Sequence, residues 1–599
     1  MKSLKHLNKY FLKYKWLLVL GTIFVIAQNF GAIYPAQKVR ESLDEVVSAV
    51  EKGKELTNVA DKTELTSTIT HIVFIFFLTI IIVAILRGVL MFLMRQTIIV
   101  MSRKIEFDLK NEIFNHYQIL SMSFYRRNNT GDLMNRISED VGRVRMYVGP
   151  AVMYSINLII LFILIMITMI QVNAKLTLYV LAPLPFLSVS IYLVSNIMNK
   201  RSEEIQQQQS HLSTFVQEAF SGIRILKSFV KEEKTSGRFE QESELYKEKH
   251  MQLVRVNSMF FPLMLLLVGL STLLTIYVGG QEVMAGRASA GNIAEFIIYV
   301  NMLTWPVAAL GWVTSIIQRA AASQERINEF LHIKPEIISG NNEAKKLQGD
   351  IEFINVGFKY PDSGITALQD ISFKVKAGKS LAIIGRTGSG KSTIANLLLR
   401  MFDVTKGKIL IDGIPIESWN LNSLRKQIGF VPQDNFLFSD TIENNIAFGL
   451  TDDIDEKERK GKVESAAHRA VIYDNIIDFP KGFQTILGER GITLSGGQKQ
   501  RVSIARAIIK DPSLLLFDDC LSAVDTRTEE SILQNLREVM SDRTAIIISH
   551  RVSTVKNADQ IIVLDHGLII EEGTHESLMT QKGLYCELYE KQLLEEEGV

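Results

Sequence analysis

A glycine-rich loop between an apolar run and a helical segment is the most specific chemical feature of the sequence. Residues 381–384 form the apolar run, the loop reads Gly-Arg-Thr-Gly-Ser-Gly-Lys-Ser over residues 385–392, and residues 393–400 have helical character. Glycines at these positions let backbone N–H groups close around phosphate oxygens, and the N-terminus of the helix favours an anion. Lys391 is expected to reach the β and γ phosphates of a nucleotide, and the hydroxyl of Ser392 is expected to bind Mg²⁺.

A second apolar run supplies a carboxylate that suits the same site. Leu514–Phe517 ends in Asp518, which we expect at the carboxyl edge of a sheet, where it would hold Mg²⁺ together with Ser392. Because any buried strand can end in aspartate, Asp518 is a candidate metal ligand only in combination with the glycine-rich loop. We expect the nucleotide phosphates to be held by Gly385, Arg386, Thr387, Gly388, Ser389, Gly390, Lys391, Ser392 and Thr393.

The elements that must position these residues are those of a soluble α/β domain. From Ile351 onward, short β-branched runs separated by Gly, Asp and Asn alternate with helical segments. This pattern predicts a parallel sheet with crossover helices. The polar stretch Glu336–Gly349 precedes it and is the expected linker.

The N-terminal half is expected to lie in a membrane. Of the 599 residues, 47% are hydrophobic and 22% are charged, which is more apolar than an ordinary soluble enzyme of this length. Apolar runs of about 20 residues can cross a bilayer. Six such runs are expected as spans, at Trp16–Gln37, Ile72–Met94, Ala151–Ile170, Leu176–Met198, Phe260–Val278 and Ile293–Ile317.

Lysine and arginine set the expected orientation of these spans. Residues 1–15, 95–150 and 199–259 are rich in Lys and Arg, whereas residues 41–70 are acid-rich. Because positive loops stay in the cytoplasm, both termini are expected there. The two long positive loops have apolar residues at helical spacing, so we expect helices that extend well below the membrane.

Overall charge and cysteine content exclude other classes of protein. The net charge is +1, so no global basic field points to nucleic acid. The two cysteines, Cys520 and Cys586, exclude a disulfide framework. Cys520 is expected to be a small packed residue and not a nucleophile.

The C-terminal half resembles the ATPase domain of the ATP-binding cassette family. Leu494-Ser495-Gly496-Gly497-Gln498 is similar to the signature motif of that family, and the helix 499–510 follows it. Gln433 resembles the Q-loop glutamine, His550 the switch histidine and Tyr360 the A-loop aromatic residue. Residues 522–525, Ser-Ala-Val-Asp, resemble the D-loop. The resemblance implies ATP and Mg²⁺ as ligands. Gln433 is then expected to touch both the nucleotide and the metal, and the residues expected to bind nucleotide are Tyr360, Ser495, Gly496, Gly497 and Gln498.

The N-terminal half resembles the transmembrane part of exporters in the same family. Residues 124–136 are similar to the first intracellular loop of these exporters, residues 222–227 to the second, and Gly488-Glu489-Arg490-Gly491 to the X-loop. The resemblance implies a half-transporter with six membrane helices over 1–335, a linker over 336–349, an α/β P-loop ATPase domain over 350–585 and a helical tail over 586–599. Such a chain works as a dimer with a second half-transporter, in which the signature motif of one subunit caps the ATP of the other.

One residue departs from the family pattern. The catalytic base that follows the metal-binding aspartate is usually glutamate in this family, whereas this chain has Asp519, whose side chain is one methylene shorter. A displacement of about 1 Å can slow a reaction about 10²-fold. We therefore keep two interpretations: a slow or asymmetric ATPase that serves in a heterodimer, and an ordinary homodimeric one. The expected catalytic residues are Asp519, His550 and Gln433.

The expected function is ATP-driven export or flipping of an amphipathic substrate across a bacterial inner membrane, with the lipid bilayer as a partner and without nucleic acid. Alternatives are a catalytically degenerate subunit of a heterodimeric exporter, a peptide exporter, and a membrane-tethered ATPase that regulates a partner. Arg87, within the second span, is expected either to reach water by snorkelling or to contact an anionic headgroup. Trp305-Pro306 is expected to mark a kink in the sixth span.

Overall fold

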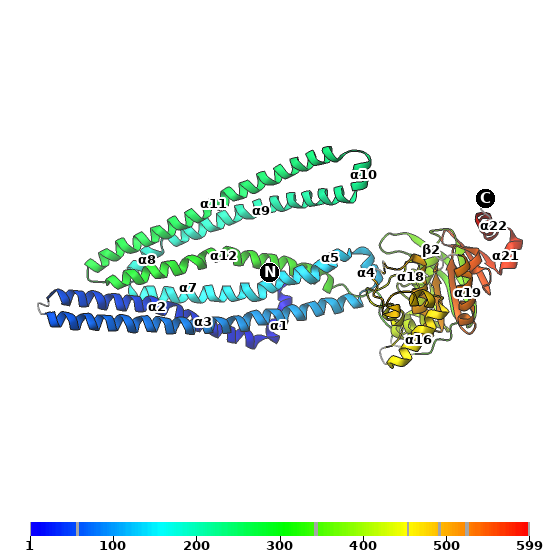
Figure 1. Cartoon of the computed structure of the whole chain (residues 1–599), viewed down its shortest axis with the longest axis horizontal. Helices are drawn as coiled ribbons and strands as arrows, with labels where there is room; N and C mark the ends of the chain where they lie inside the picture. The colour runs from blue at the N-terminus through cyan, green and yellow to red at the C-terminus, as the bar shows by residue number, and fades with distance from the viewer. Residues whose placement is uncertain are drawn as a thin grey trace. The chain divides into compact units, whose positions relative to one another are not determined.

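The computed structural model describes residues 2–55, 59–340, 345–451, 454–488, 491, 493–520 and 526–596. These residues fall into two compact units (Figure 1). The helical unit comprises Met1–Tyr117 and Gly131–Ile333, and the α/β unit comprises Gln118–Thr130 and Lys334–Val599. The short segment Gln118–Thr130 therefore belongs with the C-terminal residues, although long helices of the helical unit flank it in the sequence.

The helical unit is built from long helices. Asn173 begins one of them, because its side chain accepts a hydrogen bond from the Leu176 N–H, and Ser289 begins another through a capping box with Asn292. The bounds are η1 (Ser3–Leu7), α1 (Asn8–Lys13), α2 (Lys15–Glu55), α3 (Val59–Ile119), α5 (Thr130–Asn135), η2 (Arg136–Asp140), α6 (Val141–Met146), η3 (Tyr147–Ala151), α7 (Val152–Val172), α8 (Ala174–Leu181), α9 (Pro183–Ser221), α10 (Ile223–Ser228), α11 (Glu232–Met284) and α12 (Ala290–Leu331).

Among the described residues, five helical segments are long and apolar enough to cross a membrane, and they contain five of the six expected spans. They are Lys15–Lys54, Thr63–Ile119, Thr130–Val172, Glu232–Met284 and Ala290–Leu331. The sixth expected span, Leu176–Met198, falls on α8 and the first part of α9, where several side chains lie outside the described residues.

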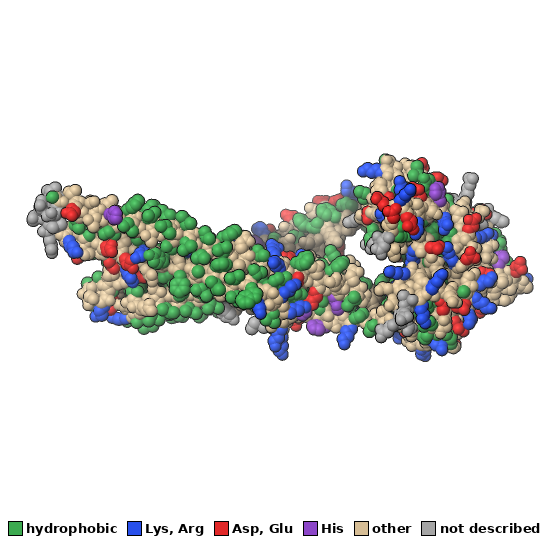
Figure 2. All heavy atoms as spheres, turned by 90° about the horizontal axis from the view of Figure 1, so that it is seen from below, with side chains coloured by type: hydrophobic (Ala, Val, Ile, Leu, Met, Phe, Trp, Pro, Cys, Tyr) green, Lys and Arg blue, Asp and Glu red, His purple; other side chains and the backbone are tan. Residues whose placement is uncertain are grey.

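The apolar surface of these helices is exposed in the way that lipid contact requires. In Thr63–Ile119, none of the most apolar stretch is buried inside the protein. Phe74 and Ile85 on α3 are 62% and 64% exposed. On the face shown in Figure 2, hydrophobic side chains cover a broad band of the helical unit. Exposed apolar surface of this extent is unfavourable in water, so lipid must cover it.

The helices also continue well beyond the apolar stretches, as the sequence predicts. At 1.5 Å per residue, the 61 residues of α3 make a helix of about 90 Å, roughly three times the hydrocarbon thickness of a bilayer. Helices α9 and α11 run side by side and are joined at their far end by α10 (Figure 1). Helix α12 continues through Pro306 to Leu331.

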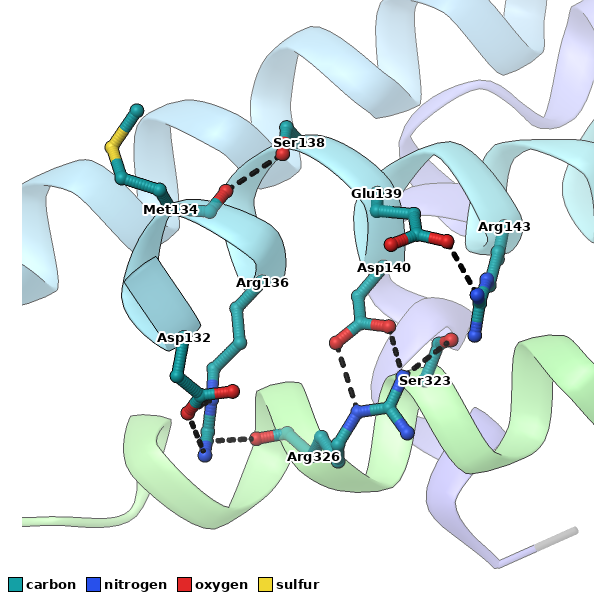
Figure 3. A network of polar contacts seen from close by, with 9 residues as sticks. All are labelled: Asp132, Met134, Arg136, Ser138, Glu139, Asp140, Arg143, Ser323 and Arg326. Carbon is teal, nitrogen blue, oxygen red and sulfur yellow. Dashed lines mark hydrogen bonds and ion pairs between the residues drawn. The ribbon is translucent and has the colours of Figure 1, made fainter. Parts of the chain in front are cut away.

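A polar network fixes the segment after α5 to the end of α12 (Figure 3). The Arg326 guanidinium on α12 forms a bidentate ion pair with Asp140, and Arg326 Nε donates to Asp140 Oδ2 at 3.0 Å. Asp140 is only 4% exposed. Arg136 donates to the Arg326 carbonyl at 2.9 Å and to Asp132 at 2.9 Å. Because a bidentate pair fixes orientation as well as distance, the two helices are held in one register here.

In the part of the α/β unit that the structure describes, there are two sheets and their connecting helices. The strands are β1 (Ile351–Lys359), β2 (Thr366–Val375), β3 (Ser380–Gly385), β4 (Lys406–Ile411), β5 (Ile414–Pro415), β6 (Ile428–Val431), β7 (Leu514–Asp518), β8 (Thr544–Ser549), β9 (Gln560–Asp565) and β10 (Leu568–Gly573). The helices are α4 (Met122–Arg127), α13 (Lys391–Leu398), η4 (Ile416–Ser418), α14 (Leu421–Lys426), α15 (Ile442–Ala447), α16 (Glu456–Arg469), α17 (Tyr473–Ile477), η5 (Gly482–Gln484), α18 (Gly496–Ile508), α19 (Thr526–Met540), α20 (Val552–Val555), α21 (His575–Gln581) and α22 (Leu584–Glu596).

The larger sheet has the order β10-β9-β3-β8-β7-β6. Its pairs β9–β3, β3–β8, β8–β7 and β7–β6 are parallel, which confirms the expected parallel sheet, and β10 adds an antiparallel edge. Alternate residues of each strand enter different cores: Ile384 and Phe517 pack on one face, and Ile383 and Leu516 on the other. The smaller sheet, β2-β1-β4-β5, is antiparallel and was not expected from the sequence.

Candidate nucleotide site

The parallel register brings the ends of four strands to one edge of the larger sheet. Ile384 pairs with Ser549, Asp518 with Ile548, and Val431 with Phe517. The loop after β3 therefore lies at the same sheet edge as the residues that follow β8, β7 and β6. These are His550 after β8, Asp519 after β7 and Gln433 after β6.

The glycine loop is held in a conformation that requires glycine. Gly390 has φ of 101°, and a Cβ atom there would lie 2.4 Å from the Ala367 carbonyl oxygen. It precedes α13, whose first residue is Lys391. The Lys391 ammonium donates to the carbonyls of Gly385 and Arg386 at 2.8 and 2.9 Å, so it lies over the loop. Burial lowers the pKa of Lys391, and the charges of Asp519 and Asp518 oppose that shift.

The donor set around Asp518 fits a magnesium ion. Ser392 Oγ donates to Asp518 Oδ1 at 3.0 Å, and Asp518 is 5% exposed. Burial raises the pKa of Asp518, while the bond from Ser392 opposes the shift. Magnesium prefers hard oxygen ligands, and it usually takes one or two carboxylates together with substrate phosphates. Within the described ranges, no group of three or more His, Cys, Asp or Glu side chains could hold a metal ion by itself.

A buried hydroxyl in the loop also fits a phosphate. Ser389 is 3% exposed, and among the described atoms its Oγ has no hydrogen-bond partner. A buried polar atom without a partner costs free energy, and a phosphate oxygen is an acceptor that could satisfy it. The loop therefore fits the triphosphate of the nucleotide that the sequence predicts.

Asp519 lies between two of the other expected site residues. Its Oδ1 is 2.7 Å from His550 Nδ1, and the Gln433 amide donates to its Oδ2 at 3.5 Å. Asp519 has φ of 49°, a left-handed conformation in which Asp is common and longer side chains are less so. Its N–H donates to the Ile548 carbonyl at 2.8 Å, which fixes it to β8. The three expected catalytic residues are thus in contact, with Asp519 at the centre.

Tyr360 makes contacts that the sequence did not predict. Its hydroxyl is 3.0 Å from Thr393 Oγ1, which links the residue that resembles the A-loop aromatic to the glycine loop. The Arg126 guanidinium lies over the Tyr360 ring, 4.3 Å from its centroid, and Arg126 Nε is 3.1 Å from Asp362 Oδ2. Arg126 belongs to α4, in the segment that resembles the first intracellular loop. Sequence reasoning missed this contact because the two residues lie far apart in the sequence.

The signature segment forms the start of α18. Ser495 is its N-cap: Ser495 Oγ accepts from the Gln498 N–H, and Gln498 Oε1 accepts from the Ser495 N–H. This capping box leaves the helix N-terminus at Gly496 and Gly497, where an anion is favoured. The expected D-loop, residues 522–525, and Glu489 and Arg490 of the expected X-loop lie outside the described residues.

These features define a protein with lipid-exposed helices and an α/β unit that carries a P-loop at the edge of a parallel sheet. Family models match the ABC transporter transmembrane region over residues 53–307 and the ABC transporter ATPase domain over residues 368–522. A probable multidrug resistance ABC transporter ATP-binding/permease protein of Bacillus subtilis is 38% identical over 81% of this chain and 83% of its own length. An ATP-dependent lipid A-core flippase of Pseudomonas fluorescens is 36% identical over 85% of this chain and 84% of its own length.

Solved structures agree with this assignment. A bacterial Atm1-family ABC exporter with ATP bound matches with a TM-score of 0.74, at 27% identity, over 98% of both chains. The chain belongs to the ABC transporter family, as an exporter in which one transmembrane region and one ATPase domain share a chain. It binds ATP, resides in a membrane and couples ATP hydrolysis to transport.

Proposed function

We propose that this exporter moves an amphipathic molecule, such as a lipid, a lipid-linked molecule or a hydrophobic drug, out of a bacterial inner membrane as a dimer of half-transporters. Both termini and the ATPase domain lie in the cytoplasm. The single observation that carries the proposal is the convergence of Lys391, Asp518, Asp519 and His550 at one sheet edge, in a chain with lipid-exposed helices.

A cavity in the helical unit supports an amphipathic cargo. It measures about 530 Å³, and apolar side chains line most of it. Arg87 on α3 and Gln171 on α7 add polar groups. An apolar cavity with one cation suits a molecule that has a hydrocarbon part and an anionic or polar part. The relatives described as multidrug resistance transporters and lipid A-core flippases handle molecules of this kind by name.

The contacts of each site residue support its expected role in ATP hydrolysis. Asp519 accepts the proton of the attacking water at its carboxylate, and His550, beside Oδ1, holds that carboxylate in place. Lys391 leaves the loop carbonyls to bind the β and γ phosphate oxygens. Ser392 and Asp518 would hold Mg²⁺, which would supply neutralisation of phosphate charge. Ser495, Gly496 and Gly497 cap the ATP of the second subunit through their helix N-terminus.

The short side chain of Asp519 favours one second candidate function. A weak base would suit the degenerate subunit of a heterodimer, which contributes an intact signature to the competent site of its partner. The two functions differ in whether this chain works alone.

Reconstitution in liposomes tests the proposal. Purified full-length chain is placed in vesicles that contain a fluorescent phospholipid, and ATP hydrolysis and lipid translocation are measured together. The proposal predicts translocation that requires ATP and Mg²⁺ and is lost in Lys391→Ala. Lys462→Ala, at an exposed lysine of α16 outside the nucleotide site, is the control and should retain the activity. Turnover without movement of any amphipathic probe would contradict the proposed cargo, and absence of both without a second subunit would favour the heterodimer.

A further inference from the structure

The C-terminal helix α22 contacts the backbone of the loop that carries His550. The Gln592 amide donates from Nε2 to the His550 carbonyl at 2.6 Å, and its Oε1 accepts from the Val552 N–H at 2.7 Å. The two hydrogen bonds span Arg551, so a single side chain holds the backbone on both sides of the turn between β8 and α20. The Val552 N–H is one of the first N–H groups of α20, which have no partner within the helix.

The helix that presents Gln592 is itself anchored. The Glu571 carboxylate on β10 accepts hydrogen bonds from the N–H groups of Leu584 and Tyr585, which fixes the start of α22. Tyr585 is fully buried, and its hydroxyl is 2.8 Å from His575 Nδ1. Gln592 lies seven residues after Tyr585, so both side chains are on the same face of the helix. The Gln592 amide is therefore presented by an anchored helix.

Two further interactions restrain the loop that Gln592 holds. His550 Nδ1 contacts Asp519, and Val552 is fully buried in the core. The His550 side chain is 49% exposed, so packing alone does not fix it. Its position depends on the backbone that Gln592 clamps. An error of about 1 Å at a catalytic contact can lower a rate about 10²-fold.

We propose that Gln592 is a positioning residue for ATP hydrolysis: it holds the backbone of the switch histidine loop so that His550 meets Asp519. This makes α22 a part of the hydrolytic apparatus of its own subunit. The inference rests on the proposed role of His550, and its test separates the two.

The test compares Gln592→Leu, which removes both hydrogen bonds, with Gln592→Glu, which retains the acceptor for the Val552 N–H and loses the donor. Steady-state ATPase of the full-length chain should show kcat about tenfold lower in Gln592→Leu, with KM for ATP unchanged within about twofold, and an intermediate loss in Gln592→Glu. The matched control is Gln581→Leu, an exposed glutamine at the end of α21, which should behave as wild type.

A double mutant distinguishes positioning from general stability. If Gln592 acts through His550, adding Gln592→Leu to His550→Ala lowers kcat no further, because effects on one unit are not additive. Amide hydrogen exchange gives a readout that does not need turnover: the Val552 N–H should exchange faster in Gln592→Leu, while the thermal midpoint stays within a few degrees of wild type.

Three results would overturn the inference. Wild-type kcat in Gln592→Leu, together with a large loss in His550→Ala, removes the role of Gln592 and leaves the proposed function intact. A loss that adds fully to that of His550→Ala, or one that comes with raised KM and a matching fall in thermal midpoint, assigns Gln592 a structural role only. Wild-type kcat in His550→Ala overturns the proposed role of the histidine itself.

Discussion

His550 Nδ1 lies 2.7 Å from Oδ1 of Asp519, and the two residues directly follow neighbouring parallel strands. Register explains their contact: Asp518 pairs with Ile548, so Asp519 follows opposite Ser549, the residue directly before His550. The pair links the expected base to the expected switch, and its strength depends on the length of the Asp519 side chain.

Changing that length tests the role of Asp519. We expect Asp519→Glu to raise ATP turnover about tenfold, because the longer side chain reaches about 1 Å further toward a bound phosphate. Asp519→Asn should lower turnover at least about 10²-fold, because an amide cannot accept the proton of the attacking water. Steady-state ATPase of the three proteins decides the matter; equal rates would show that Asp519 is not the base.

Arg126 should affect nucleotide affinity and leave the chemical step unchanged. Its guanidinium covers one face of the Tyr360 ring, and a cation–π contact of about 1 kcal/mol must be given up before a base can stack there. Arg126→Ala is therefore expected to lower KM for ATP about fivefold with kcat unchanged. Arg127→Ala is the neighbouring control, because Arg127 pairs with Glu336 at 3.9 Å between Nη1 and Oε1. A higher KM in Arg126→Ala would mean that the arginine holds the base instead of blocking it.

The Asp140–Arg326 pair should stabilise the helical unit. Asp140 is buried, but the Arg326 side chain is 42% exposed, so removing one partner is expected to cost about 1–2 kcal/mol and not the full cost of a buried charge. Asp140→Asn should lower the thermal midpoint in detergent. Glu139→Gln removes an exposed pair with Arg143 in the same segment and should change little. Equal midpoints for both variants would contradict a structural role for the buried pair.

Lys510 should make stability depend on pH in the alkaline range. Burial lowers its pKa to about 8, whereas the unfolded chain keeps the ordinary value near 10.5. Between these values only the unfolded state binds the proton, so the free energy of unfolding rises with pH. Below about pH 8 both states are protonated, and the folded state carries the full cost of burying the charged ammonium. Lys510→Met should therefore raise the thermal midpoint at pH 7, with the gain shrinking toward pH 10. The exposed Lys462 gives the control substitution, and a gain that is independent of pH would contradict the assignment.

The sequence predicted the strand ends of the site but not the contacts that join them to distant segments. The glycine loop, Asp518 and His550 each follow an apolar run, and parallel pairing necessarily brings such positions together. Arg126 and Gln592 carry no local pattern of their own, because their partners are set by tertiary packing. The antiparallel sheet was missed for a related reason: its strands β1 and β2 read as further short β-branched runs, and pairing direction is not visible in composition.

We expect ATP to draw two copies of the α/β unit together, and the distance between the copies tests this expectation most directly. A spin label is placed at the exposed Thr493 of each subunit, beside the signature segment, in Asp519→Asn with the buried Cys520 and Cys586 replaced. Pulsed electron paramagnetic resonance should show a shorter, narrower distance distribution with ATP and Mg²⁺ than without, and no change when Lys391→Ala is added. ATP binding is measured in the same samples, both for this chain's own dimer and for a dimer with a companion half-transporter. If ATP binds and the distance stays unchanged in both dimers, the account is contradicted.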